Sequence, residues 1–335
     1  MTALRTDTRY DVIAIGNAIV DVMAPCDDAL IDELQLAKGN MTLIDADGAR
    51  ELYAAMGPAK EISGGSAANT LAGLAALGSQ CAFIGQVAND QLGDVFSHDI
   101  RAVGIDFDTP AREGEPPTAR CLIFVTPDGE RTMNTFLGAS QFLPEEALDL
   151  DLIADSAVLY LEGYLWDPEE PRAAMRRAIA AARKAGTKVA LTPSESFVID
   201  MHGDDFRALI DEGQIDILFA NEGEMTTLVG TDDFEDGLAQ LSEKIPVVAI
   251  TRGADGAVAI ADGERAETRA QAVDEVVDTT GAGDLFAAGF LRGHTTGRGL
   301  SDCLAMGATC AAEIISHYGA RPEADLKALV EAKLG

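Results

Sequence analysis

The chain has 335 residues, 47% of them hydrophobic, and a formal net charge of −31. A surface this acidic repels nucleic acid and anionic membranes, so neither is an expected partner. No apolar run is long enough to cross a bilayer and the first ten residues carry no hydrophobic signal region, so we expect a soluble cytoplasmic protein. Five scattered cysteines without a CxxC pair favour reduced thiols and argue against a zinc site.

Short β-branched runs alternate along the chain with Ala-rich amphipathic stretches. The first kind predicts strands at Asp11–Gly16, Cys81–Gly85, Ala157–Glu162, Lys188–Thr192, Ile215–Asn221 and Val247–Thr251. The second kind predicts helices at Ala67–Leu77, Gln91–Val103, Pro168–Ala185, Glu222–Leu228 and Phe234–Glu243. This alternation indicates an α/β fold with a mostly parallel central sheet and helices on both faces.

Two segments interrupt the alternation. Asn17–Ile44 contains short alternating runs with little helical pattern. The runs Thr118–Thr126 and Arg131–Phe136 flank a Pro127-Asp128-Gly129 turn, which predicts a hairpin. We expect these segments to form a small antiparallel sheet beside the main one, although ordinary edge hairpins would give the same pattern.

The most specific motif is Asp278-Thr279-Thr280-Gly281-Ala282-Gly283-Asp284, which runs into an apolar, Ala-rich helical pattern. Free N–H groups and the dipole at a helix N-terminus form an anion site, and glycines let the backbone approach a phosphate. Asp284 can be interpreted as an N-cap carboxylate or as a general base beside that site. We favour the base, because capping alone does not require glycines on both sides of Ala282.

Two other nucleotide-binding signatures do not fit the sequence. Gly281 and Gly283 match the first two glycines of a dinucleotide fingerprint, but Phe286 stands at the third, and the loop lies near the C-terminus instead of at the first βα turn. The P-loop pattern GxxxxGK[ST] does not occur. An NAD-dependent oxidoreductase is therefore disfavoured.

Three weaker elements precede this motif. Ser63–Thr70 places Gly64-Gly65 before a helical pattern, Asn221-Glu222-Gly223-Glu224 ends an apolar strand, and Thr251–Gly256 is a tight turn after another strand. Ligands bind at strand carboxyl ends in such sheets, where an acid suits a hydrated Mg²⁺. A solvated helix start explains the acids of the second element equally well.

In their order along the chain, these elements resemble those of the ribokinase (PfkB) family of carbohydrate and nucleoside kinases, over nearly the whole sequence. The resemblance implies a ribokinase-like three-layer α/β fold with a small β-sheet lid, in a single kinase unit. It implies a lid at about residues 17–45 and 106–137, and a large domain at about 1–16, 46–105 and 138–335. It further implies ATP as phosphoryl donor, Mg²⁺, and K⁺ in some members.

The resemblance also implies roles for individual residues. Asp284 resembles the catalytic base, and the anion hole is implied for Gly281, Ala282 and Gly283. Acceptor binding is implied for Asn17, Asp21, Gly64, Gly65 and Asn69, of which Asp21 and Asn69 suit a vicinal diol. ATP contacts are implied for Asn221, Glu224, Thr251, Gly253 and Gly256, with Glu224 ordering Mg²⁺ through water. Asp278 matches the monovalent-cation loop of some members, together with backbone carbonyls near Thr280 and Gly319.

The acceptor has to be inferred from the lid and nearby loops. Arg131 on the hairpin is either an ATP contact made on lid closure or an ordinary surface arginine. The side chains that suit a purine, or else pack in the core, are Phe136, Leu137, Tyr164 and Trp166. The runs Gly129–Gly138 and Leu161–Asp167 are similar to bacterial adenosine kinases of this family, which favours adenosine. A kinase for ribose or another free sugar remains the alternative, and a non-catalytic nucleoside- or sugar-binding regulator is the hypothesis from another class. Monomer and homodimer are both open.

Overall fold

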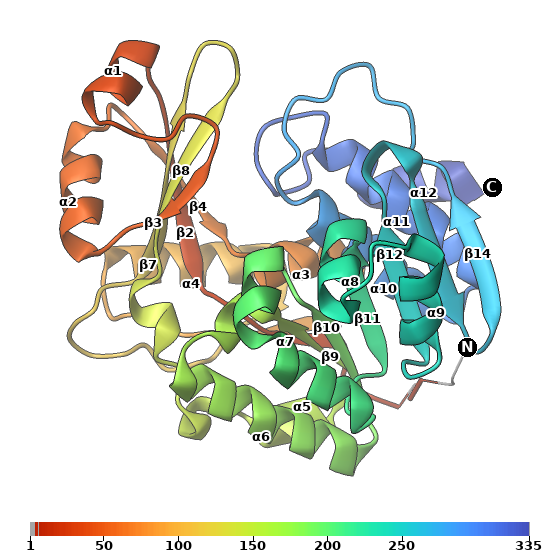
Figure 1. Cartoon of the computed structure of the whole chain (residues 1–335). Coiled ribbons are helices and arrows are strands. Elements are labelled where there is room, and N and C mark those ends of the chain that lie inside the picture. Colours follow the sequence, from red (N-terminus) through yellow and green to blue (C-terminus); the bar gives the residue numbers. More distant parts are fainter. Residues whose placement is uncertain (1–3, 6, 335) are drawn as a thin grey trace.

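The computed structural model describes residues 4–5 and 7–334 and contains two β-sheets (Figure 1). The larger sheet has nine strands in the order β14-β13-β12-β11-β10-β9-β1-β5-β6. They are β1 (Tyr10–Ile15), β5 (Cys81–Ile84), β6 (Ile105–Asp106), β9 (Ser156–Glu162), β10 (Lys188–Thr192), β11 (Ile217–Asn221), β12 (Val247–Thr251), β13 (Ala257–Ala261) and β14 (Glu264–Thr268). Strands β6 to β12 pair in parallel, and β13 and β14 add an antiparallel edge. All the predicted strands are found, with small shifts at their ends.

Helices cover both faces of this sheet. Alternate residues of β1 point to opposite sides, so Val12 and Ala14 belong to one core and Ile13 and Ile15 to the other. The first core includes α3 (Ser66–Ala76), α4 (Gln91–Ala102), α10 (Ala282–Thr295), α11 (Leu300–Ile314) and α12 (Leu326–Leu334). The second includes α5 (Leu150–Ala154), α6 (Glu169–Ala185), α7 (Ser196–Asp211), α8 (Glu222–Val229) and α9 (Phe234–Ser242). The predicted three-layer α/β architecture is confirmed.

The second sheet, with α1 (Asp28–Glu33) and α2 (Ala46–Ala55), forms a separate lobe at the upper left of Figure 1, here called the lid. Its strand order is β3-β8-β7-β2-β4. The strands are β2 (Ile19–Pro25), β3 (Met41–Leu43), β4 (Lys60–Gly64), β7 (Ala119–Val125) and β8 (Arg131–Phe136). The predicted β7–β8 hairpin is confirmed.

The lid sheet differs from the expectation in two ways. It is mixed instead of antiparallel, because β2 pairs with β7 and β3 with β8 in parallel. It also takes in β4, which pairs with β2 and comes from a stretch expected in the large domain. This short strand joins the lid because it leads directly into the Gly-rich start of α3, where the chain re-enters the large domain. Among the described residues, no helix is long and apolar enough to span a bilayer.

Candidate active site

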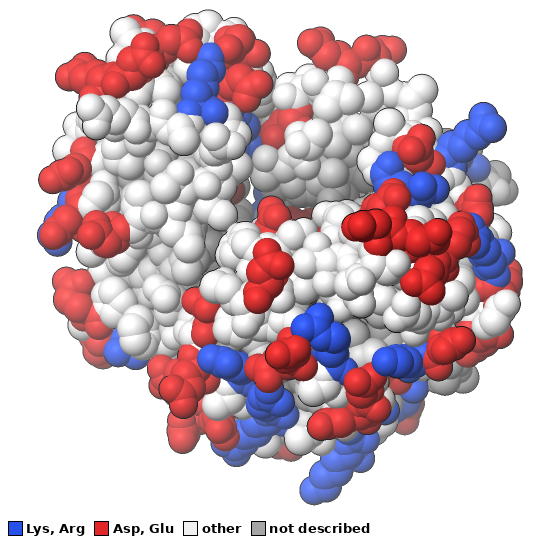
Figure 2. Space-filling model, in the orientation of Figure 1, with Lys and Arg blue, Asp and Glu red and all other residues white. Residues whose placement is uncertain are grey.

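A cleft of about 650 Å³ lies between the lid and the carboxyl ends of the main strands. Side chains at or just beyond the ends of five parallel strands line it, namely Asn17, Glu162, Thr192, Asn221 and Thr251. The starts of α3 and α10 complete its floor with Ser66 and the run Gly281–Asp284. Strand order reverses at β1, and in open parallel sheets such a reversal creates the crevice where ligands bind. In Figure 2 the cleft separates the lid from the large domain, and acidic side chains are spread mainly over the outer surface.

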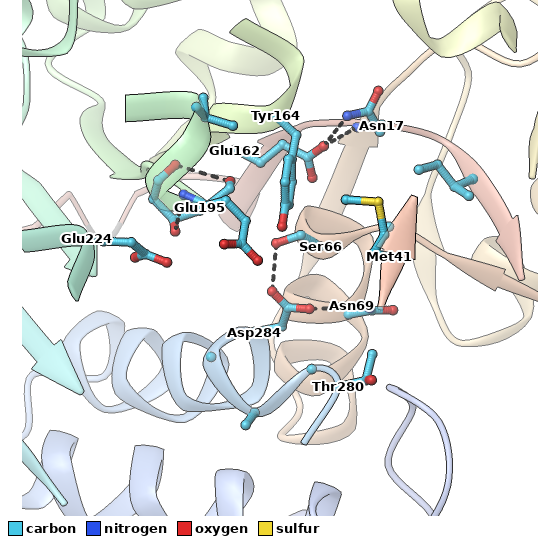
Figure 3. A pocket seen from close by; sticks show the side chains of 18 of the residues that line it. Asn17, Met41, Ser66, Asn69, Glu162, Tyr164, Glu195, Glu224, Thr280 and Asp284 are labelled. Atoms are coloured by element: carbon cyan, nitrogen blue, oxygen red, sulfur yellow. Dashed lines mark hydrogen bonds between the residues drawn. The ribbon is translucent and has the colours of Figure 1, made fainter. Parts of the chain in front are cut away.

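Asp284 lies in the first turn of α10, and its carboxylate is directed at α3 (Figure 3). Ser66 Oγ donates to Asp284 Oδ1 at 2.6 Å, and Asn69 Nδ2 donates to Oδ2 at 3.2 Å. The N-cap position belongs to Gly281, so Asp284 is not the N-cap. Burial raises the pKa of Asp284 to about 6, while the bonds from Ser66 and Asn69 and the charge of Arg321 act in the opposite direction. Such a carboxylate is largely ionised at neutral pH and accepts protons better than an ordinary aspartate.

The loop before α10 has the shape of an anion site. Gly281 adopts a left-handed conformation with φ of +80°, and a Cβ there would lie 2.8 Å from the Cβ of Ala320. At Gly283 an added Cβ would meet nothing within 4 Å, so this side of the helix start is open to the cleft. A helix N-terminus that is open in this way suits a phosphate group. The structure thus brings Gly281, Ala282 and Gly283 together beside Asp284, as expected.

Two glycines allow the start of α3 to pass close to β2 and to the end of β1. A Cβ at Gly65, whose φ is +98°, would lie 2.3 Å from the carbonyl oxygen of Asn17. A Cβ at Gly64 would lie 2.6 Å from Asp21 Oδ2. Gly65 and Asp21 line the cleft, whereas Gly64 lies behind them. Any larger residue at either position would displace the elements that carry the expected acceptor residues.

Asp21 and Asn69 both have capacity for a ligand. Burial raises the pKa of Asp21 to about 6, although the charges of Arg131 and Arg321 lower it. Asn69 is 5% exposed, and its Oδ1 is buried without a hydrogen-bond partner among the described residues. Buried acceptors in proteins are nearly always satisfied, so a hydroxyl of a ligand is a suitable donor to this oxygen.

Glu162 links β1 and β9 where the strand order reverses. Its Oε1 accepts hydrogen bonds from the backbone N of Asn17 at 2.7 Å and from Asn17 Nδ2 at 2.8 Å, and its Oε2 accepts from the N of Ala67 at 2.8 Å. Burial raises the pKa of Glu162 to about 7, against the lowering effect of these bonds. The sequence analysis treated Glu162 only as the end of a strand. An acid at the carboxyl end of a buried parallel strand is the signal that would have identified it.

Asn221 and Glu224 form a reciprocal pair at the start of α8. Glu224 accepts hydrogen bonds from Asn221 Nδ2 at 2.7 Å and from its backbone N at 3.0 Å, while Asn221 Oδ1 accepts from the N of Glu224 at 2.8 Å. Glu224 is only 6% exposed, so its interpretation as a solvated residue is wrong. Burial raises its pKa to about 7, the bond from Asn221 lowers it, and the charges of Glu195 and Asp284 raise it. Glu195, which the sequence analysis missed, also lines the cleft (Figure 3).

This donor set fits a magnesium ion that arrives with a nucleotide. Among the described residues, no group of three His, Cys, Asp or Glu side chains is arranged to hold a metal. Mg²⁺ in phosphoryl-transfer sites is commonly bound through one or two carboxylates, several waters and the phosphates of the substrate. The carboxylate of Glu224 is placed to serve such an ion through water.

Arg131 and Asp278 form a buried ion pair between the lid and the loop before α10. Asp278 also accepts hydrogen bonds from the N–H groups of Thr280 and Gly319, each at 3.0 Å. Burial acts to raise the pKa of Asp278, but these bonds and the charge of Arg131 outweigh it and lower the pKa. Arg131 is therefore placed against Asp278 and not among the residues that line the cleft. Its guanidinium supplies the positive charge beside a carboxylate that was expected to face a monovalent cation.

Two of the expected base-pocket residues lie away from the cleft. Strand residues alternate between faces, so Leu137 lines the cleft while Phe136 points to the opposite side, where its ring centroid is 5.8 Å from the Arg120 guanidinium. Trp166 is fully buried and donates to Asp205 Oδ2 at 2.9 Å. The expected contact of these two side chains with a bound base is therefore wrong. Tyr164, the fourth candidate, does line the cleft (Figure 3).

The turn after β12 contributes less than expected. Thr251 lines the cleft, but Gly253 and Gly256 do not. Gly256 has a φ of +95°, and a Cβ there would lie 2.0 Å from the carbonyl oxygen of Thr268. Its glycine is required by the close pairing of β13 with β14 and not by a ligand.

Comparison with known proteins adds independent information. The family model "pfkB family carbohydrate kinase" matches residues 39–326. A probable sugar kinase from Rhizobium etli superposes with a TM-score of 0.90 and 46% identity, covering 97% of this chain and 98% of that one. Adenosine kinase from Sinorhizobium meliloti superposes with a TM-score of 0.89 and 47% identity, covering 97% of this chain and 99% of that one. A fructokinase from Klebsiella pneumoniae is 29% identical over 72% of this chain and 80% of its own length.

Proposed function

Because this chain belongs to the pfkB family of carbohydrate kinases, we propose that it transfers the γ-phosphoryl group of ATP to the hydroxymethyl group of adenosine, giving AMP and ADP. Membership of the family confirms the resemblance drawn from the motifs and makes the chain a phosphotransferase with an alcohol acceptor. The choice of a nucleoside as acceptor is the proposal.

The apolar lining of the cleft is the observation that carries this choice. One face of the lid sheet turns toward the cleft with the side chains Ile19, Met41, Leu43, Ile123 and Met133. Across the cleft lie Phe197 and Met201 of α7, with Tyr164 nearby. Met41, Leu43, Phe197 and Met201 are between 38% and 54% exposed, so they offer apolar surface to a ligand. A purine can bury this surface, whereas a free sugar presents hydroxyl groups on every side.

The polar end of the cleft suits the ribose of the same ligand. Asp21 and the unpartnered oxygen of Asn69 would bind the diol, and the hydroxymethyl group would lie toward Asp284. Asp284 would accept the proton of the attacking hydroxyl, an effect typically worth about 10²–10⁴-fold in rate. The open start of α10 would hold the transferring phosphoryl group, whose charge Mg²⁺ offsets when the nucleotide is bound.

ADP release from a panel of acceptors tests the proposal. ATP and Mg²⁺ are supplied with adenosine, other nucleosides, ribose or fructose, and the specificity constants are compared in one assay. We expect adenosine to exceed both sugars by at least about tenfold, because stacking of a base on an aromatic side chain contributes about 1–3 kcal/mol. A preference for ribose or fructose would overturn the nucleoside assignment and leave the family assignment intact. ADP release with no acceptor in the panel would favour a non-catalytic regulator.

A variant of the lid tests the apolar wall directly. Leu43, on β3, is 53% exposed and faces the cleft, whereas Val103, at the end of α4, is 47% exposed and is not among the lining residues. Leu43→Ser should lower kcat/KM for adenosine about three- to tenfold, since about 1 kcal/mol of apolar contact is lost. Val103→Ser, the matched control, should leave it unchanged. Equal effects of the two substitutions would contradict the proposed base pocket.

A further inference from the structure

The loop between α11 and α12 joins the two halves of the site. At Gly319 the backbone N–H donates to Asp278 at 3.0 Å, at the head of the phosphoryl loop, here residues 278–284. The next residue, Ala320, packs against Gly281 of the same loop. The residue after that, Arg321, reaches the acceptor loop, here residues 63–69. Three consecutive residues thus contact both loops.

Arg321 holds the acceptor loop from both ends. Its Nε and Nη2 donate to the carbonyl oxygen of Ser63, each at 3.0 Å, and Nη2 also donates to Ser63 Oγ at 3.1 Å. Its Nη1 donates to the carbonyl oxygen of Ala68 at 2.7 Å. Gly64, Gly65 and Ser66 lie between these two carbonyls. Only a planar group with several fixed donors can bond both sides of such a loop.

The guanidinium also places a positive charge between carboxylates. Burial lowers the pKa of Arg321 to about 10, against the charges of Asp21, Asp284 and Asp99, so it stays protonated at neutral pH. Its direct partners are neutral carbonyl and hydroxyl oxygens, which leaves its charge to act on the carboxylates nearby. Holding a desolvated cation on neutral partners opposes folding, so a role in the reaction is a reason for its presence.

We propose that Arg321 is a positioning residue for phosphoryl transfer, which holds the acceptor loop in register with the phosphoryl loop and supplies the positive charge that favours the ionised form of Asp284. The inference rests on the proposed role of Asp284 as base. Its substrate class follows whichever acceptor the panel identifies.

Several groups face Asp284 and set the background for any pH effect. Ser66 and Asn69 donate to it from α3. The charges that interact with it come from Arg321 and from the acids Glu162 and Glu224, and the hydroxyls of Tyr160 and Tyr164 lie close enough to respond to it. Arg321 is the one cation whose charge acts on Asp284 among these groups. Its removal should therefore move the titration of the base more than the loss of a distant arginine.

The test compares Arg321→Gln, Arg321→Lys and a control, Arg292→Gln. Arg292 lies at the other end of α10, where it contacts Ser79 and Asp11. The readouts are kcat/KM for the acceptor between pH 5.5 and pH 9, the KM of ATP, and the melting temperature. In Arg321→Gln the acidic limb should move to higher pH by about one unit, since a nearby arginine lowers a carboxyl pKa by about one to three units. The KM of the acceptor should rise about tenfold and that of ATP much less.

Arg321→Lys separates charge from geometry. Its ammonium keeps the charge, so the acidic limb should stay near the wild-type position. It cannot bond both carbonyls, so the KM of the acceptor should remain raised. A wild-type acidic limb and acceptor KM in Arg321→Gln would overturn the proposal, as would equal shifts in Arg292→Gln. If Arg321→Gln does not fold, a wild-type acceptor KM in Arg321→Lys overturns the proposal and a raised one supports it. Full turnover by Asp284→Asn would instead disprove the proposed base, and so distinguishes that failure from this one.

Discussion

Ser66 on α3 donates a hydrogen bond of 2.6 Å to Asp284 on α10, which ties the helix of the acceptor loop to the proposed base. Asn69, one turn further along α3, bonds the other carboxylate oxygen. A single helix therefore fixes both oxygens of Asp284. The same helix begins at the glycines that shape the acceptor side of the cleft, so base and acceptor are positioned by one element.

Loss of the Ser66 hydroxyl should change the pH dependence of the reaction. The bond from Ser66 lowers the pKa of Asp284, which burial raises to about 6. In Ser66→Ala the pKa should rise further, and the ionised base should form only at higher pH. We expect the acidic limb of kcat/KM to move upward by about one to two pH units, since hydrogen bonds to charged groups are worth about 1.5–3 kcal/mol.

Ser66→Thr is the matched control for this prediction, because it keeps a hydroxyl donor at the same position. Its acidic limb should stay close to that of the wild type. The profile is measured from pH 5 to pH 9 at low acceptor concentration. An unchanged limb in Ser66→Ala would show that this hydrogen bond does not set the ionisation of the base.

Asp21 is expected to recognise the diol of the acceptor. Asp21→Ala should raise the KM of adenosine strongly and that of ATP little, because hydrogen bonds to a carboxylate contribute about 1.5–3 kcal/mol each. In the wild type, 2′- or 3′-deoxyadenosine should lose a similar factor. In the variant, removal of the same hydroxyl should cost much less. Equal losses in both proteins would show that Asp21 does not bind the diol.

The magnesium requirement tests Glu224. Its carboxylate is 6% exposed and lines the cleft. Glu224→Gln should raise the Mg²⁺ concentration for half-maximal rate about tenfold or more, because the amide is a weaker partner for waters of a hydrated cation. Glu222→Gln is the control, since Glu222 lies in the same helical turn but pairs with Arg252 at 3.0 Å. The same Mg²⁺ dependence in both variants would assign Glu224 a structural role in the capping of α8 alone.

The large domain and the phosphoryl loop were predictable from the sequence because their signals are local. Buried parallel strands appear as short β-branched runs, and an open helix start that binds a phosphate shows as Gly281-Ala282-Gly283 before an apolar helix. The β7–β8 hairpin was found from its Pro-Asp-Gly turn for the same reason.

What was missed depends on contacts between distant parts of the chain. The face of β8 that turns toward the cleft is set by the register of the whole lid sheet, so Phe136 and Leu137 cannot be told apart locally. The pairing of Arg131 with Asp278 joins residues 147 positions apart. Arg321 has no motif of its own, and its role is visible only once its loop is seen beside the acceptor loop.

The central claim is that Asp284 accepts the proton of the acceptor hydroxyl in this cleft. The most direct measurement is the single-turnover rate of AMP formation by Asp284→Asn with saturating adenosine and ATP, alongside the Kd of each ligand. The account predicts a rate at least about 10²-fold below that of the wild type, with both Kd values nearly unchanged, because the amide keeps the shape of the side chain but cannot take the proton. A rate within a few-fold of the wild type would contradict it.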